Sequence, residues 1–229
     1  MPSTFLTALA WAYIVVAFAC ALTIVFDVVV RGYRQMMGVM EWVWPITTIY
    51  LGPLSLWAYF RYGRQYSPKF QHEHGLDGPN APHWMRVAIS TSHCGAGCTL
   101  GDIIAETLIF AFALTLFGAT IWASYGLDYL FAFSLGVVFQ YFALTQMGIR
   151  GVKELGKRTA QADLYSLTAF EIGLFVWMGL NYFVFFTDPH LEANSIVFWF
   201  MMQVGMIIGF LTSYPANVWL IKRGVKEAM

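Results

Sequence analysis

The sequence has few charged residues and only three cysteines. Charged residues make up 11% of the 229, whereas hydrophobic residues make up 59%. Soluble domains carry about 25% charged residues, so this composition excludes an ordinary soluble domain. It predicts an integral membrane protein with the lipid bilayer as its main partner. The formal net charge is zero, which leaves no basic surface for a nucleic acid.

Several familiar motifs are also absent. The sequence contains no phosphate-binding loop, no G-x-S-x-G and no H-E-x-x-H, which excludes an ATP-driven pump acting alone and the familiar hydrolases. No lysine lies within a predicted spanning segment, which argues against a retinal Schiff base. Three cysteines cannot all pair with one another, so no disulfide framework is expected. We interpret Cys20 as a small apolar core residue.

Six apolar runs are long enough to cross a hydrocarbon core, which requires about 20 helical residues. They cover residues 5–30, 38–60, 98–122, 128–149, 164–187 and 195–221. We therefore predict an all-α integral membrane protein in which residues 1–229 form a single transmembrane helical bundle. Pro45 and Pro53 lie inside the second run and predict a kinked or discontinuous helix there.

The third helix is expected to begin at a bend. Residues 83–123 are together far longer than a single crossing requires, so a break is expected within them. Gly95, Gly97 and Gly101 offer the place for a glycine-rich elbow. Residues 84–92, which precede it, are then expected to lie at the membrane interface.

A G-x3-G pattern in the sixth run, formed by Gly205 and Gly209, predicts close helix packing. Small residues let two membrane helices approach each other closely. The glycines of the third helix have the same property. We therefore expect the third and sixth helices to pack against each other.

The distribution of Lys and Arg predicts the orientation in the membrane. With six crossings, the two termini and residues 61–97 and 150–163 share one side, which carries eleven of the 13 basic residues. Basic residues favour the cytoplasmic side, so we predict a multi-pass protein of the inner (plasma) membrane with both termini cytoplasmic. Arg31 and Arg34 lie on the other side, which would be explained if the second helix did not fully cross.

The segment SHCGAGCTLGDIIAE carries the main candidate site. Cys94, Cys98, Asp102 and Glu106 follow one another at i+4 spacing, so on a helix they form one stripe. Thiolates together with the imidazole of His93 are ligands that suit Cu(I) or Zn(II). This pattern predicts a metal site, while a redox-active thiol pair and ordinary packing remain open as alternatives.

Carboxylates inside predicted spans extend the candidate site. Intramembrane charge costs about 2.5 kcal/mol or more near the bilayer centre, so such groups should face the bundle interior and pair there. Arg150 could form ion pairs with them, and the resulting polar cluster would then have a purely structural role. The acids outnumber this one cation, which favours protons or a bound cation. The predicted metal-site residues are His93, Cys94, Cys98, Asp102, Glu106 and Glu171.

Two motifs resemble a family of bacterial multi-helix membrane proteins that is known as a domain of unknown function. These are SHCGAGCTLGDIIAE and, near the C-terminus, SYPANVWLIKRGVKEAM. The likeness covers residues 84–229. It implies a helical membrane fold and brings neither a mechanism nor a substrate.

Three hypotheses about function arise from these features. The first is a membrane protein that binds or translocates a small cation, in particular a soft transition metal such as copper, with Cu(I) or Zn(II) as the bound ion. The second is a membrane enzyme, in which the cysteine pair exchanges electrons with a quinone, or the acids and Tyr214 act on a lipid-phase substrate. The third is a scaffold without a site. The sequence leaves the oligomeric state open, including a homo-oligomer.

Overall fold

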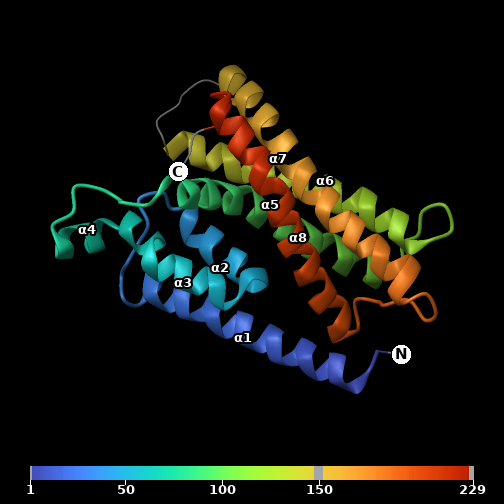
Figure 1. Cartoon of the computed structure of the whole chain (residues 1–229). Coiled ribbons are helices and arrows are strands. Elements are labelled where there is room, and N and C mark those ends of the chain that lie inside the picture. Colours follow the sequence, from blue (N-terminus) through green and yellow to red (C-terminus); the bar gives the residue numbers. More distant parts are fainter. Residues whose placement is uncertain (1, 147–151, 227–229) are drawn as a thin grey trace.

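The computed structural model describes residues 2–146 and 152–226, and its regular elements are all helical (Figure 1). In chain order they are α1 Thr4–Val29, α2 Met40–Leu51, α3 Pro53–Arg61, the 3-10 helix η1 Gly63–Tyr66, α4 Pro68–His74, α5 His83–Phe112, α6 Thr120–Gln146, α7 Val152–Leu180, the π-helical turn η2 Asn181–Phe185 and α8 Ile196–Lys222. The predicted all-α class is confirmed.

Five helices in the described part of the chain, not six, are long and apolar enough to cross a membrane. These are α1, α5, α6, α7 together with η2, and α8. The second predicted run is not one long helix, because it is divided into α2 and α3, of 12 and 9 residues. A hydrocarbon core about 30 Å thick requires about 20 helical residues, so neither helix spans it.

Gly52 divides the second run. Its φ of 54° and ψ of −129° lie in a region that favours glycine, and Pro53 then begins α3 with no backbone donor to lose. Pro45, by contrast, lies inside α2 without ending it. The Thr48 hydroxyl donates to Ser55 Oγ at 2.8 Å across the break. The predicted discontinuity is therefore a turn between two helices at Gly52, not a kink in one.

The two short helices enter the bundle and return to the same end of α1. The hydroxyl of Tyr13 donates to Tyr50 O at the tip, and the hydroxyl of Tyr59 donates to Asp27 at the base. Tyr13 and Asp27 are separated by about 21 Å along α1. Gln203 Nε2 also donates to the carbonyl of Ile49. Side chains thus satisfy carbonyls that the helix end leaves free within the membrane region.

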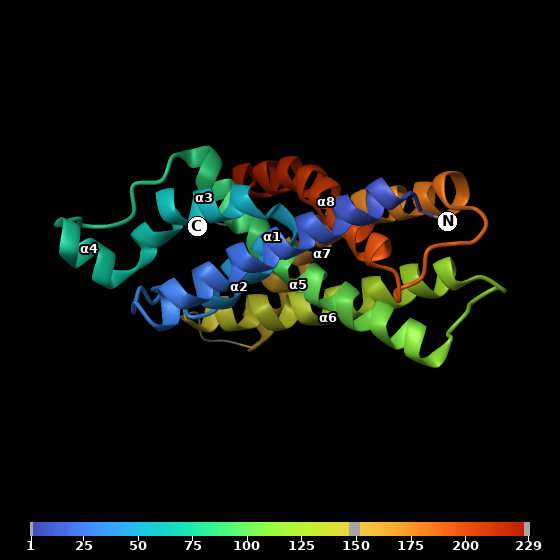
Figure 2. The same cartoon turned by 90° about the horizontal axis from the view of Figure 1, so that it is seen from below.

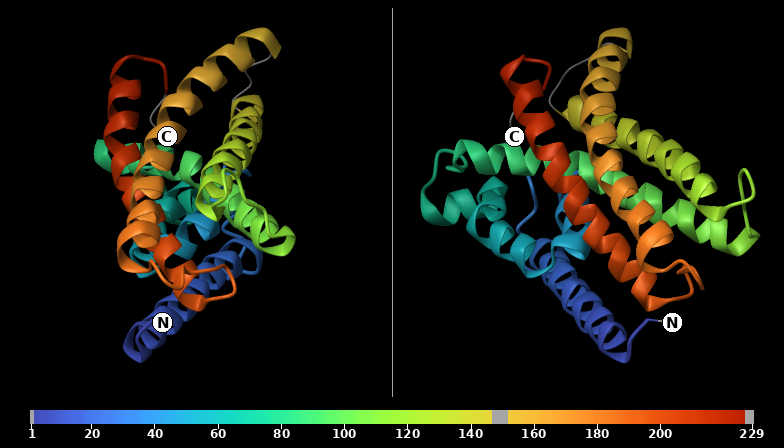
Figure 3. Two further views of the ribbon diagram at one scale, coloured as in Figure 1. Left: turned by 90° about the vertical axis from the view of Figure 1, so that its right-hand side faces the viewer. Right: turned by 45° about the vertical axis from the view of Figure 1, so that its right-hand side comes forward.

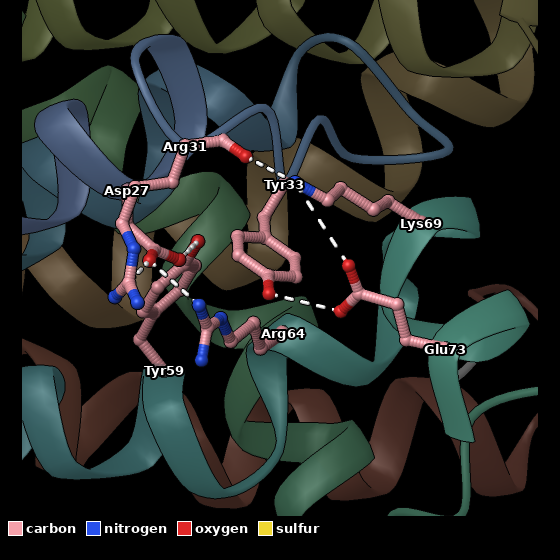
Figure 4. A network of polar contacts seen from close by, with 7 residues as sticks. All are labelled: Asp27, Arg31, Tyr33, Tyr59, Arg64, Lys69 and Glu73. Atoms are coloured by element: carbon pink, nitrogen blue, oxygen red, sulfur yellow. Dashed lines mark hydrogen bonds and ion pairs between the residues drawn. The ribbon is translucent and has the colours of Figure 1, made fainter.

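A network of polar contacts holds the base of this helical hairpin (Figure 4). The buried carboxylate of Asp27 accepts hydrogen bonds from Arg64 at 2.9 Å and from Arg31 at 3.3 Å. The Arg64 guanidinium lies 3.7 Å from the centroid of the Tyr33 ring. The Tyr33 hydroxyl donates to Glu73, and this bond raises the pKa of Tyr33. The residues after α1 and those after α3 therefore lie at one end of the molecule.

We expect Asp27→Asn to lower the free energy of unfolding by about 2 kcal/mol, because the largely buried Arg64 guanidinium would keep only a neutral partner. Thermal unfolding in detergent measures the change. Asp77→Asn is the matched control, since Asp77 is exposed, and it should have little effect. Equal effects of the two substitutions would contradict a stabilising role for this network.

α5 is one continuous helix of 30 residues, so the predicted glycine-rich elbow is wrong. Its glycines serve packing against α6. A Cβ on Gly97 would lie 3.0 Å from the Cα of Gly136, and one on Gly101 would collide with the backbone of Ala132. The chain turns only after α5, at Ala113, where φ is 49°. The glycines bring two helix backbones together and do not bend one of them.

α5 and α8 are in contact, as predicted, but the G-x3-G of α8 packs against α7. A Cβ on Gly209 would lie 2.7 Å from the carbonyl oxygen of Phe170, and Gly205 faces the side chains of Leu174 and Trp177. Two antiparallel pairs, α5 with α6 and α7 with α8, therefore make up the bundle, and Figure 3 shows α7 and α8 side by side in both views.

The start of α1 and the end of α8 lie at opposite ends of the molecule (Figures 1 and 2). Residues 30–39, residues 61–82 and the end of α8 lie at one end, which we call the basic end. The loops 113–119 and 186–195 and the start of α1 lie at the other, which we call the pocket end. The side of the membrane that each end faces stays a prediction.

Candidate functional site

All six predicted site residues lie in the bundle interior. Five are on α5 and Glu171 is on α7, and each side chain is at most 5% exposed. In chain order they are His93, Cys94, Cys98, Asp102, Glu106 and Glu171. The structure separates them into two groups along α5, with the thiol of Cys98 between the groups. Arg150, the predicted partner of the acids, lies outside the described residues.

The first group contains His93 and Cys94, and a buried lysine, Lys226, joins it. Lys226 Nζ donates to Cys94 Sγ at 3.0 Å, to Asn217 Oδ1 at 2.7 Å and to Ser90 O at 3.1 Å. Asn217 is itself held by Ser166 Oγ at 2.7 Å. We call Ser90, Cys94, Asn217 and Lys226 the lysine cluster. It closes the basic end of the bundle interior and places an ammonium group beside the thiol.

The predicted metal ligands do not converge. Among the described residues no group of three or more His, Cys, Asp and Glu side chains is arranged to hold a metal ion. Nε2 of His93 is buried without a hydrogen-bond partner, but the neighbouring thiol of Cys94 already accepts from Lys226. A metal ion at Cys94 would meet the charge of that lysine. The metal site therefore stays a prediction.

Four carboxyl groups from three helices form the second group. We call Asp102 and Glu106 on α5, Asp128 on α6 and Glu171 on α7 the acid cluster. Asp102 lies within electrostatic range of the other three. Neither carboxylate oxygen of Asp102 nor of Glu171 has a hydrogen-bond partner, and the same holds for Oδ1 of Asp128. A carboxyl group in such surroundings is strongly unfavourable in its ionised form. It must therefore either keep its proton or bind a cation.

Two further groups extend the acid cluster toward the basic end. The thiol of Cys98 lies near Glu171 without the geometry of a hydrogen bond. The Tyr50 hydroxyl, supplied by the tip of the hairpin, also lacks a hydrogen-bond partner. It sits where a Cβ on Gly95 would be only 2.9 Å away. Polar groups thus continue from the acid cluster toward the lysine cluster.

A cavity of about 330 Å³ reaches the acid cluster from the pocket end. Glu106, Asp128 and Ser124 line it, and the Glu106 side chain lies within hydrogen-bonding reach of the other two. Residues of the loops 113–119 and 186–195 also contribute to its wall. Asp102 and Glu171 lie beyond this cavity, within the bundle.

Sequence reasoning missed Asp128 and Lys226. Asp128 is the first residue of the predicted fourth run, where a charge looks like a helix end. In the structure α6 begins at Thr120, more than two turns earlier, so Asp128 lies inside the bundle. A helix predicted to begin at Thr120 would have placed Asp128 inside the bundle. No local signal marks Lys226 as buried, because its partners are 136, 132 and 9 residues away.

Comparison with known families covers the part of the chain that carries these groups. Residues 83–226 match a family model described as a domain of unknown function, DUF4396. The chain belongs to this family. The matched part includes α5 to α8, the acid cluster and Lys226, whereas α1 to α4 precede it. The resemblance read from the two sequence motifs is therefore confirmed. No curated protein and no solved structure matches the chain.

Proposed function

We propose that this protein binds and translocates a small cation across the membrane, with the acid cluster as the binding site and the proton as the first candidate. The observation that carries this proposal is the state of Asp102 and Glu171. Both carboxyl groups are buried inside a membrane bundle, and none of their oxygens has a hydrogen-bond partner. Such groups require a proton or a cation to offset their charge.

The surroundings of the acid cluster support access for a cation from the pocket end. The cavity connects Glu106 and Asp128 to the pocket end. From Glu106 to Cys94 the polar stripe of α5 extends over about 18 Å, more than half of a typical hydrocarbon core. The lysine cluster closes the far end of this stripe, so translocation requires Lys226 to move.

Carboxyl oxygens favour protons and hard cations, whereas soft metals favour thiolates. A site for Cu(I) or Zn(II) at His93, Cys94 and Cys98 is the second candidate, and it would require Lys226 to leave Cys94. Elemental analysis of the purified protein distinguishes the two: stoichiometric copper or zinc supports the second candidate, and a metal-free protein that conducts protons supports the first.

The direct test is cation flux in proteoliposomes. A pH-sensitive dye inside the vesicles reports proton entry when a potential is imposed with potassium and valinomycin. The wild-type protein should acidify the interior faster than empty vesicles do. Flux no faster than in empty vesicles, under both signs of the potential, would reject translocation of protons.

The distribution of basic residues supports an orientation with the N-terminus outside and the C-terminus in the cytoplasm. Twelve of the 13 Lys and Arg residues belong to helix ends and connections at the basic end: Arg31, Arg34, Arg61, Arg64, Lys69, Arg86, Lys153, Lys157, Arg158, Lys222, Arg223 and Lys226. The thirteenth, Arg150, lies outside the described residues. The connections at the pocket end contain none. Basic residues favour the cytoplasm, so five crossings fit this rule better than six.

We expect a cysteine at Ser3 to react with a membrane-impermeant maleimide in intact cells, and a cysteine at Asp77 to react only after permeabilisation. The three native cysteines are buried, so they add little background. Thr187→Cys, at the pocket end, is the matched control and should behave like Ser3→Cys. Labelling of Ser3→Cys and Asp77→Cys from the same side would contradict the five-span orientation.

A further inference from the structure

The cavity above the acid cluster is lined by acidic side chains but by no Lys or Arg among the described residues. It lies between the pocket ends of α5, α6, α7 and α8 and has a volume of about 330 Å³, within the range typical of small-molecule sites. The carboxyl groups of Glu106 and Asp128 line it, and no Lys or Arg is among its lining residues in the described part of the chain. Glu192 and His190 are also among the lining residues, so acidic side chains outnumber the one histidine and the electrostatic character of the cavity favours a cation.

Two residues that line the cavity each carry a buried oxygen without a hydrogen-bond partner. Asp128 and Asn181 are each 4% exposed, and Oδ1 of each has no partner. The amide nitrogen of Asn181 already donates to Trp177 O at 2.8 Å, which leaves its oxygen as a free acceptor. Asn181 begins the π-helical turn η2, and such turns are frequent at functional sites. A ligand with several N–H donors would satisfy these oxygens.

Aromatic and thioether side chains form much of the remaining wall. Tyr125 stacks on Phe175 at 4.5 Å between ring centroids, and its hydroxyl donates to Phe175 O, so the ring is fixed in place. Phe198 and Met202 also line the cavity. An apolar wall of this kind favours an organic body over a hydrated metal ion.

We propose that this cavity binds a small organic ammonium ion, with its nitrogen at Asp128, Glu106 and Asn181 and its apolar part against Tyr125 and the neighbouring wall. This inference deepens the proposed function and rests on it in one respect: the bound ammonium replaces one proton of the acid cluster, and the remaining proton is shared by the two carboxyl groups that face the cavity.

The test uses benzylammonium as the probe and benzyl alcohol as its neutral counterpart, with binding to the full-length protein in detergent measured by titration calorimetry. We expect benzylammonium to bind at least about tenfold more tightly than benzyl alcohol. Asp128→Asn should weaken benzylammonium binding by at least about tenfold and leave benzyl alcohol unchanged. Asp188→Asn is the matched control, because Asp188 is exposed at the same end.

Equal affinity for the two probes, or unchanged benzylammonium binding in Asp128→Asn, would overturn the inference. Thermal unfolding shows whether Asp128→Asn is folded. If it is not, Asn181→Leu replaces it, with the same expected loss. Proton flux and its dependence on Asp102 and Glu171 test the proposed function separately, since neither residue lines the cavity. Benzylammonium binding without proton flux would reject translocation and support the ammonium site. Proton flux without benzylammonium binding would support translocation and reject the ammonium site.

Discussion

The Asp102→Asn, Glu171→Gln double variant should lose proton flux by about a hundredfold, the order of magnitude by which positioned acid–base groups accelerate proton transfer. Each substitution keeps the shape of the side chain and removes its ability to take up and release a proton. The same variant should unfold at the same temperature as the wild type or higher, because it no longer buries two unpartnered carboxyl groups. Dye-loaded proteoliposomes measure the flux, and thermal unfolding measures the stability.

This combination of outcomes separates a functional acid cluster from a structural one. A scaffold that uses Asp102 and Glu171 only for packing would lose stability or association in the double variant. Asp77→Asn, an exposed substitution at the basic end, controls for a general effect of charge on reconstitution and should keep full flux. Full flux in the double variant would remove the acid cluster from the proposed mechanism.

Gly101→Val should have the largest effect on stability, a loss of about 3 kcal/mol in the free energy of unfolding. A Cβ at Gly101 would overlap the backbone nitrogen and Cα of Ala132 on α6. A backbone cannot rotate away as a side chain can, so α5 and α6 would have to separate. Unfolding in detergent with increasing SDS measures the loss, and proton flux should fall with it because Asp128 would move away from α5.

The matched control for this substitution is Gly126→Ala on α6. A Cβ at Gly126 would have no heavy atom within 4 Å, and alanine stabilises a helix interior by about 1 kcal/mol relative to glycine. Gly126→Ala should therefore be neutral or stabilising. If Gly101→Val were as stable as Gly126→Ala, the close contact between α5 and α6 would not exist in the membrane.

The glycine contacts and the acid cluster depend on each other. Gly97 and Gly101 let α6 approach α5, and this approach brings Asp128 to Glu106. In the same way the contact of Gly209 with Phe170 holds α7 against α8. The cluster therefore exists only where three helices are packed closely, which explains why a spacing pattern on α5 alone shows just half of it.

Much of the fold was readable from local composition. Five of the six predicted apolar runs correspond to helices that are long enough to span, and the predicted membership of a family of unknown function is confirmed. Pro45 and Pro53 predicted a kinked or discontinuous helix in the second run, but they did not show that the chain turns back at Gly52, where φ is positive. Hydropathy measures how apolar a segment is, and it does not show whether the chain turns back.

The sequence by itself determined that this chain is helical and lies in a membrane, because apolar segments must satisfy their backbone hydrogen bonds internally in lipid. It also determined that Asp102, Glu106 and Glu171 are buried, because charged groups avoid lipid. Only the tertiary structure decided that Asp128 joins them, that Lys226 binds Cys94 and that the start of α1 and the end of α8 lie at opposite ends. Those outcomes depend on contacts between residues far apart in the chain, which no local pattern records.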